Sequence, residues 1–170
     1  MIKGSKIYLR ALEPSDLNFL YNLENKPENW LISHTQIPYS KHILAQYIHS
    51  TEDIYTTKQV RFVICKLNHT PIGTIDIFDF NPQHQRAGLG IIITEKERNK
   101  GFAKEALELT VNYCFSILLL KNIYCNILED NTASKKLFEN MGFNLIGIKK
   151  NWINSVDGWK NESFYQLFNF

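Results

Sequence analysis

The sequence predicts one α/β (α+β) domain, a mixed and mostly antiparallel sheet of about seven strands flanked by about four helices. Segments with strand-like patterns alternate with segments of helical spacing in the order strand, two helices, three strands, helix, strand, helix, two strands. The length of 170 residues suits one domain. The chain has no internal repeat or Pro/Gly/Ser-rich linker. Residues 1–170 are therefore expected to form a single domain.

The N-terminal part is expected to contain one strand and two helices. Ile7–Leu12 is typical of a strand, and the segment 13–16, Glu-Pro-Ser-Asp, is typical of the start of a helix. A second helix is expected near Lys41–Ile48. Between the helices Pro27 should break the chain, so residues 25–39 are interpreted as a loop of the kind that can carry ligand contacts. Its bulky members are Trp30, His34 and Tyr39.

The middle of the chain is strand-like and then helical. Val60–Leu67 and Pro71–Phe80 flank Asn68-His69-Thr70, which is typical of a hairpin turn, and a third strand, Ala87–Thr94, follows. From residue 103 to residue 118 the apolar residues recur on one helical face. The three strands are therefore expected to precede a long amphipathic helix.

The C-terminal part repeats the alternation. Asn122–Leu128 is mostly apolar and is expected to be a buried strand. Asn131 stands where the cap of a short helix would lie, and Gly142 is a natural end for that helix. Two last strands, Asn144–Asn151 and Ser163–Phe168, are expected to be joined through Asp157-Gly158.

Composition excludes several functional classes. The net charge of +2, from 19 Lys and Arg against 17 Asp and Glu, is too small to indicate nucleic acid as the main partner. The start of the chain has no apolar signal-peptide stretch, and no apolar run is long enough to span a membrane. The cytoplasm is the expected location. The cysteines Cys65, Cys114 and Cys125 are not spaced as metal ligands, and each is expected to be a small buried hydrophobe.

The most informative segment joins a strand to a helix. The strand residues Ile91, Ile92, Ile93 and Thr94 lead into a turn with the sequence Arg98, Asn99, Lys100, Gly101, Phe102, Ala103, Lys104. Unpaired N–H groups and the helix dipole make such a junction an anion site. Gly101 allows the backbone to turn and to approach a phosphate, and three basic residues add positive charge.

Other phosphate-binding motifs fit less well. A P-loop requires Gly-Lys-Ser/Thr after its glycines, which this segment lacks. Gly88-Leu89-Gly90 has two glycines of a dinucleotide fingerprint, but the third is missing and no helix is expected to begin there. A charged turn with a glycine for geometry alone remains the alternative interpretation.

The motifs together resemble the GNAT superfamily of N-acetyltransferases. The pattern Arg98-x-x-Gly101-x-Ala103 is followed by a long helix, a strand ending near Asn131, and the segment 134–143, Ser-Lys-Lys-Leu-Phe-Glu-Asn-Met-Gly-Phe. The segment 8–17, Tyr-Leu-Arg-Ala-Leu-Glu-Pro-Ser-Asp-Leu, is also similar to the start of that family. The resemblance covers nearly the whole chain, and the motifs occur in the order of the family.

The resemblance implies acetyl-CoA as cosubstrate and no metal. The turn at residues 98–104 would bind the CoA pyrophosphate through main-chain amides, and the strand at Ile91–Ile93 would pair with the pantetheine arm. A splayed pair of parallel strands, ending at Thr94 and Asp130, would leave the slot for the cofactor. The residues expected at the cofactor are Ile91, Ile92, Ile93, Arg98, Asn99, Lys100, Gly101, Phe102, Ala103, Lys104, Asn131, Ser134, Lys136 and Phe138.

The expected reaction is direct attack of an amine on the thioester. An alkyl ammonium with a pKa near ~10 must first lose a proton, and a carboxylate is the expected general base. Asp76 and Asp79 interrupt an apolar strand that should lie beside the cofactor strand. Three residues apart on a strand, they point to opposite faces, so only one can enter the cleft. Asp76 is preferred because Asp79 precedes a turn.

One residue departs from the family pattern. Phe138 stands where many members carry a tyrosine that protonates the leaving thiolate. A thiolate with a pKa near ~8.5 can leave without strong help. Tyr165 and Tyr124 are alternative proton donors that the sequence alone does not place.

The acceptor is expected to be a small amine or a peptide N-terminus. The chain is most similar to spermidine acetyltransferases and to enzymes that acetylate ribosomal-protein N-termini, and a polyamine is preferred. An antibiotic amine, a non-catalytic acyl-CoA-binding protein and a plain interaction domain are the alternatives. Family members are often dimers or larger. The carboxylates that would suit a polyamine lie in the N-terminal third: Glu13, Asp16, Glu24, Glu28, Glu52 and Asp53.

Overall fold

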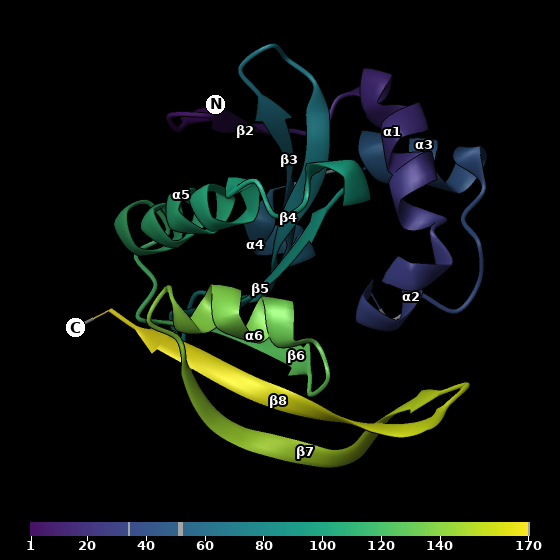
Figure 1. Ribbon diagram of the computed structural model, residues 1–170. Coiled ribbons are helices and arrows are strands. Elements are labelled where there is room, and N and C mark those ends of the chain that lie inside the picture. The colour runs from purple at the N-terminus through teal and green to yellow at the C-terminus, as the bar shows by residue number, and fades with distance from the viewer. Residues whose placement is uncertain (34, 51–52, 170) are drawn as a thin grey trace.

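A mixed sheet of eight strands forms the centre of the molecule in a computed structural model that describes residues 1–33, 35–50 and 53–169 (Figure 1). The strand order is β1-β2-β3-β4-β5-β6-β8-β7, and all neighbours are antiparallel except the parallel pair β5 and β6. The strands are β1 Ile2–Lys3, β2 Ile7–Ala11, β3 Val60–Lys66, β4 Pro71–Asn81, β5 Arg86–Ile93, β6 Asn122–Leu128, β7 Asn144–Ser155 and β8 Gly158–Phe168.

Six α-helices are present in the described residues, and two short 3-10 turns, η1 Pro14–Asp16 and η2 Glu95–Glu97, accompany them. The predicted α/β class and the splayed parallel pair are confirmed; the structure adds the short edge strand β1 and two helices. The helices are α1 Leu17–Glu24, α2 Pro27–Ser33, α3 Lys41–His49, α4 Ile54–Thr57, α5 Phe102–Ser116 and α6 Thr132–Glu139.

Helices cover both faces of the sheet, and strand alternation supplies each of them with apolar side chains. Ile7 and Leu9 of β2 point to the face packed by α5 and α6, where the larger core lies. Tyr8 of β2, with Val63 and Cys65 of β3, points to the opposite face and packs against α1 and α3. In Figure 1, α5 and α6 lie apart from the group formed by α1, α2 and α3. The expected burial of all three cysteines is confirmed.

Part of the segment interpreted as a loop is a helix. Residues 25–39 were expected to be irregular, but α2 begins at Pro27 and extends to Ser33. Pro27 does not break this helix because it is its first residue, where a missing N–H removes no helical hydrogen bond. His34 lies outside the described residues. The indole of Trp30 donates to the carbonyl oxygen of Glu24 at 2.8 Å, which joins α2 to α1.

The last hairpin is longer than the sequence indicated. Its strands β7 and β8 extend to Ser155 and from Gly158, beyond the predicted Asn144–Asn151 and Ser163–Phe168. Gly158 adopts φ of 106° at the turn, in the left-handed region that favours glycine. The additional strand residues were not predicted because many of them are polar, such as Asn161. A hairpin at the edge of a sheet that is exposed to solvent does not need alternating apolar residues.

Candidate active site

The two parallel strands separate and leave a slot between them. β5 and β6 pair only from Arg86 to Gly88 and from Asn122 to Tyr124. Beyond these pairs β5 continues to Ile93 along β4, while its other edge faces the gap. Backbone N–H and C=O groups on such an edge require partners, and an extended ligand with amide groups can supply them.

The turn that follows β5 presents a helix N-terminus to this slot. Gly101 has φ of 84° and is the N-cap of the 15-residue helix α5, and Asn99 also lies in the left-handed region at 61°. The first backbone bond of the helix runs from Glu105 N to Gly101 O at 3.2 Å. The N–H groups of Phe102, Ala103 and Lys104 precede that bond, so they are open to an anion.

The basic side chains near this turn are less available than the sequence indicated. Lys100 Nζ lies 3.0 Å from Glu97 Oε2, and Lys104 Nζ lies 3.7 Å from Glu108 Oε1. Hydrogen bonds from Lys66 and then Lys100 hold the pKa of Glu97 below its usual range. Arg98 donates through Nε to the carbonyl oxygen of Ile93 at 3.1 Å. The turn therefore offers main-chain donors more than free cations.

The start of α6 forms the other wall. Asn131 caps this helix, because its Oδ1 accepts from the N–H of Ser134 at 3.1 Å, as its position in the sequence predicted. Phe138, only 3% exposed, packs edge-on against Phe143 with ring centroids 5.0 Å apart. Among the expected cofactor residues that the structure describes, Lys100 and Lys136 do not line the cavities at the slot.

Two joined cavities occupy the slot. The first, of about 460 Å³, lies against the turn and the starts of α5 and α6. The second, of about 440 Å³, lies along β4, β5 and β6 and reaches Phe138 and β8. Ile32, Ile91, Ile92, Asn131 and Ser134 line both of them. Both volumes are in the range of ligand pockets, and the shared lining makes them one continuous binding region.

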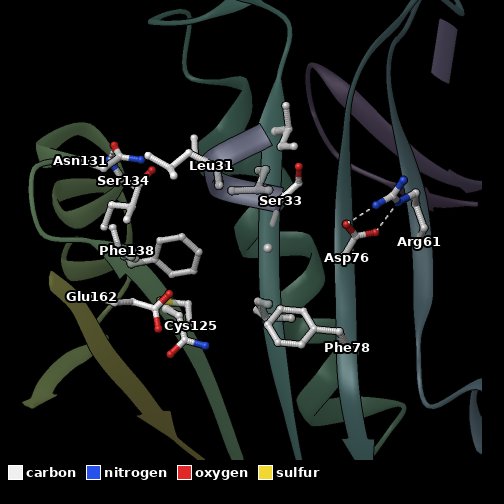
Figure 2. A pocket seen from close by; sticks show the side chains of 18 of the residues that line it. Leu31, Ser33, Arg61, Asp76, Phe78, Cys125, Asn131, Ser134, Phe138 and Glu162 are labelled. Carbon is white, nitrogen blue, oxygen red and sulfur yellow. Dashed lines mark hydrogen bonds and ion pairs between the residues drawn. The ribbon is translucent and has the colours of Figure 1, made fainter. Parts of the chain in front are cut away.

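Asp76 lines the second cavity and is bound to a half-buried arginine. Arg61 of β3 donates through Nε to Asp76 Oδ1 at 2.6 Å and through Nη2 to Asp76 Oδ2 at 2.9 Å (Figure 2). Its Nη1 donates to Glu24 of α1. Burial alone would lower the pKa of Arg61, but the Asp76 and Glu24 carboxylates raise it above the ordinary value. The result is a hydrogen-bonded Glu24–Arg61–Asp76 triad, of which Arg61 and Asp76 line the second cavity.

Phe78 lines the same cavity, and a glycine on β5 leaves space for its ring. A Cβ atom at Gly88 would lie 2.3 Å from the ring of Phe78, so the glycine makes room for that ring. Phe78 in turn packs edge-on against Tyr124, at 5.8 Å between centroids. The role of Gly88 is therefore steric, which agrees with the rejection of a dinucleotide fingerprint for the segment 88–90.

The other carboxylate considered as a base lies elsewhere. Asp79 is exposed, has φ of 50° at an irregularity in the β4–β5 register, and accepts a hydrogen bond from the Tyr124 hydroxyl at 2.8 Å. Burial and then that hydrogen bond raise the pKa of Tyr124. The structure thus brings Asp76 to the cavity and ties Asp79 to Tyr124.

The tyrosines considered as proton donors both donate hydrogen bonds to carboxylates. Tyr165 is buried and donates to Glu139 Oε1 at 2.9 Å, and burial followed by this bond raises its pKa to about 12.

Tyr39, which comes from the segment expected to carry ligand contacts, lines the second cavity. It also lines a third cavity of about 250 Å³ bounded by Glu24, Tyr47 and Arg61. In Figure 2, Leu31 and Ser33 of α2 lie across the opening above β5.

Several site residues were missed because they come from distant elements. Arg61 and Glu162 belong to β3 and β8, and only the folded sheet brings them to the second cavity. A basic or acidic residue inside an otherwise apolar strand was the available signal for Arg61. Glu162 is 4% exposed and binds Lys149 Nζ through Oε2 at 2.8 Å.

The acidic residues of the N-terminal third separate into different roles. Glu28 lines the first cavity, at the slot, and Glu24 lines the third cavity, outside the slot. Asp16 is bound by Arg10, and Asp53 caps α4. Glu13 caps the turn η1. Glu52 lies outside the described residues. Only part of this acidic group therefore faces the slot.

Two features are absent from the described residues. No group of three or more His, Cys, Asp or Glu side chains there is arranged to hold a metal ion. No helix in the same part of the chain has the length and hydrophobicity needed to span a bilayer.

Comparison with known proteins identifies the architecture. A family model described as an acetyltransferase (GNAT) domain matches residues 6–144. Spermidine N(1)-acetyltransferase of Vibrio cholerae serotype O1 is 31% identical over 140 residues, which cover 82% of this chain and 80% of that protein.

Solved structures agree with the sequence comparison. Spermidine N-acetyltransferase of Vibrio cholerae in complex with CoA and spermine matches with a TM-score of 0.88 at 27% identity, covering 97% of this chain and 96% of that one. A dodecameric structure of the Vibrio cholerae enzyme in an intermediate state matches with a TM-score of 0.83 at 27% identity, covering 97% and 95%.

Proposed function

The chain belongs to the GNAT family of acetyltransferases, and on that premise we propose that it transfers an acetyl group from acetyl-CoA to a primary amine of a polyamine. The observation that carries the proposal is the continuous region formed by the two joined cavities, one at a helix N-terminus and one beside a carboxylate. The first suits a diphosphate and the second suits an ammonium group. We further propose that residues 1–170 act as one catalytic domain.

The cofactor would lie in the slot between β5 and β6. The open N–H groups at the start of α5 would bind the pyrophosphate, and the free edge of Ile91–Ile93 would pair with the two amides of the pantetheine arm. Asn131 and Ser134 would contact the arm from the α6 side, and Phe138 would pack near its thioester end. Lys100 and Lys136 would contribute through charge at a distance.

The acceptor would lie in the second cavity with its amine toward Asp76. At neutral pH an alkyl amine is mostly protonated, since its pKa is near ~10. The Asp76 carboxylate would accept that proton directly or through water, because each oxygen keeps a lone pair after bonding to Arg61. Arg61 would fix the orientation of Asp76, which makes Arg61 a positioning residue.

The neutral amine would then attack the thioester carbonyl carbon. Its lone pair forms the C–N bond, the carbonyl oxygen takes the negative charge, and collapse of this intermediate breaks the C–S bond. The nitrogen then loses its second proton to water or to the released thiolate, which leaves a neutral amide. An N–H on the edge of Ile91–Ile93 would stabilise the oxyanion. The leaving thiolate has a pKa near ~8.5 and can depart without a donor at Phe138.

The polyamine assignment is supported by the relatives and by charge in the cavities. The Vibrio cholerae relative is named for spermidine, and its matched structure contains CoA and spermine. In this chain Glu24, Asp76 and Glu162 line the second and third cavities. Three carboxylates against Arg61 and Lys149 leave a net negative wall, which favours a polycation.

Self-association is also part of the proposal. The matched Vibrio cholerae structure is dodecameric, and the match covers 97% of this chain. We expect light scattering to give a mass above that of a 19.9 kDa monomer. A monomer at every concentration would contradict this part and leave the acetyl transfer untouched.

A thiol-release assay tests the function. Purified protein with acetyl-CoA would be offered spermidine, spermine, a monoamine, a peptide with a free N-terminus and an aminoglycoside. We expect free CoA thiol and acetylated product with the polyamines at rates well above the others. Acetyl-CoA binding without thiol release from any amine would refute the enzyme, and release with the peptide alone would replace the acceptor.

A further inference from the structure

Lys149 of β7 places its ammonium group in a site built for a cation. Its Nζ lies 2.8 Å from Glu162 Oε2 and 2.9 Å from Asn126 Oδ1. The same Nζ lies 5.3 Å from the ring centroid of Trp152 and 5.7 Å from that of Phe164. A carboxylate, an amide oxygen and two aromatic rings are the groups that bind ammonium ions in proteins.

This cation site opens onto the acceptor cavity. Glu162 and Asn126 both line the cavity, on the β8 and β6 side. Figure 2 shows the Glu162 carboxylate beside Cys125 and Phe138, across the strand β5 from the Asp76 carboxylate. One cavity therefore carries a carboxylate on each of two opposite walls, and the space between the walls is lined by apolar residues such as Phe78 and Leu89.

The pair of Glu162 and Lys149 is unequal in burial. The Glu162 side chain is 6% exposed, whereas the Lys149 side chain is 33% exposed and can turn toward water. A buried carboxylate requires a counterion, because an uncompensated buried charge is strongly destabilising. Lys149 supplies that counterion in the chain itself, and an ammonium group of a ligand can supply it equally well.

We propose that Glu162 and Asn126 bind a second, non-reacting ammonium group of the acceptor, and that Lys149 is the resident counterion with which this group competes. The inference rests on the proposed function and specifies its acceptor as an amine with at least two cationic groups. Asp76 then faces the reacting amine while Glu162 holds the other end. The methylene chain between the two cations lies against the apolar walls.

The geometry makes opposite predictions for the two partners. In Glu162→Gln the carboxylate charge is lost, so the KM for spermidine is expected to rise at least tenfold, whereas the KM for butylamine, which has one amine, changes less than twofold. In Lys149→Met the competitor is lost, so the KM for spermidine is expected to fall about threefold or more. A merely structural ion pair predicts the same direction for both variants.

Matched controls separate local effects from general ones. Lys150→Met removes an equal charge from the neighbouring exposed residue of β7 and is expected to leave the KM for spermidine unchanged. Lys149→Gln keeps a polar group for Glu162 if the methionine variant does not fold. Thermal unfolding and acetyl-CoA affinity measured on every variant show that the fold and the cofactor site are intact.

Direct binding makes the test independent of turnover. Calorimetric titration of spermidine into the CoA-loaded protein is expected to show at least tenfold weaker binding in Glu162→Gln and tighter binding in Lys149→Met. Equal spermidine affinity in wild type and Glu162→Gln, or weaker binding in Lys149→Met, would overturn the inference. If the wild type binds spermidine in this pattern but releases no thiol, the enzyme proposal fails and the ammonium site stands.

Discussion

The two halves of the slot differ in the kind of group that lines them. The cofactor half consists mainly of backbone: the free edge of β5, the left-handed Gly101 and the open N–H groups of α5. The acceptor half consists of side chains from β3, β4, β6, β8 and α2. The backbone groups of the first half lie within one continuous stretch of sequence from β5 to α5, and the second half is assembled only when the sheet has formed.

This difference explains what each half tolerates. A backbone site depends on conformation, so most side chains of the turn can change while glycine at the left-handed position cannot. A side-chain site depends on identity and orientation, so a single conservative change alters its chemistry. We therefore expect substitutions in the two halves to fail in different ways.

The largest expected effect belongs to the acceptor half. Asp76→Asn removes the proposed proton acceptor while preserving size, so kcat is expected to fall at least about 100-fold. The affinity for CoA, measured by calorimetry, should stay within about twofold of wild type. The loss should also shift the pH–rate profile. A kcat near that of wild type would move the role of base to another residue.

Breaking the backbone half requires changing its conformation. Gly101→Val places a β-branched residue at φ of 84°, which only glycine adopts readily, so the turn should rearrange and the Kd for CoA should rise at least about 30-fold. Gly158→Val imposes similar strain at φ of 106° in the distant hairpin turn and serves as the control. Equal CoA affinity in both variants would contradict a backbone-made phosphate site.

Low pH should destabilise the acceptor half, because it weakens the ion pair of Arg10 and Asp16 at the start of α1. Arg10 binds Asp16 at 2.6 Å; burial would raise the pKa of Asp16, but the Arg10 hydrogen bond and the Glu13 N–H lower it below the ordinary value. A lowered folded pKa gives stability that is present above pH ~4 and lost as the pH falls through the folded value. Asp16→Asn should cost about 1.5 kcal/mol at pH 7. Urea unfolding from pH 7 to 3 should show the gap to wild type shrinking below pH ~4.

Basic side chains at the turn sharpen the comparison. If backbone donors dominate, the double variant Lys100→Ala and Lys104→Ala should weaken CoA binding less than about fivefold, because both lysines already bind Glu97 and Glu108. Calorimetry at low and at physiological salt measures the effect. A loss as large as that of Gly101→Val would show that side-chain charge, and not the turn, holds the phosphates.

The smallest effect is expected where the two halves meet. Phe138→Tyr restores the hydroxyl common in the family, but a thiolate with a pKa near ~8.5 leaves readily, so kcat should change less than about threefold. The buried hydroxyl should also lower the melting temperature slightly. Steady-state kinetics from pH 6 to 9 provide the measurement. A tenfold rise in kcat would show that protonation of the thiolate limits the present enzyme.

The same contrast describes what the sequence could predict. Strand-to-helix junctions carry local signals, so the turn at Gly101 and the Asn131 cap were predicted correctly from spacing and residue type, and the start of α5 was predicted to within one residue. Alternation, which is also local, showed that only one of Asp76 and Asp79 can enter the cleft, and Asp76 was preferred because Asp79 precedes a turn; Asp76 does line the second cavity. The proton-transfer role given to Asp76 is a prediction that the kinetic experiments test.

The remaining features depended on long-range contacts. Arg61 reaches Asp76 through the β3–β4 pairing, and Glu162 reaches the cavity through the β6–β8 pairing. Neither strand register can be predicted from a local sequence pattern. Pro27 was interpreted as a break because position within a helix, which decides whether proline is tolerated, was unknown before α2 was seen.

The short ladder between β5 and β6 has a mechanical consequence. The N-terminal and C-terminal portions of the sheet are joined by three residue pairs, Arg86–Gly88 with Asn122–Tyr124. A ligand bound between the separated ends of β5 and β6 would contact both portions and so connect them. Occupancy would then stiffen the whole protein, and substrate supply would tune its resistance to unfolding.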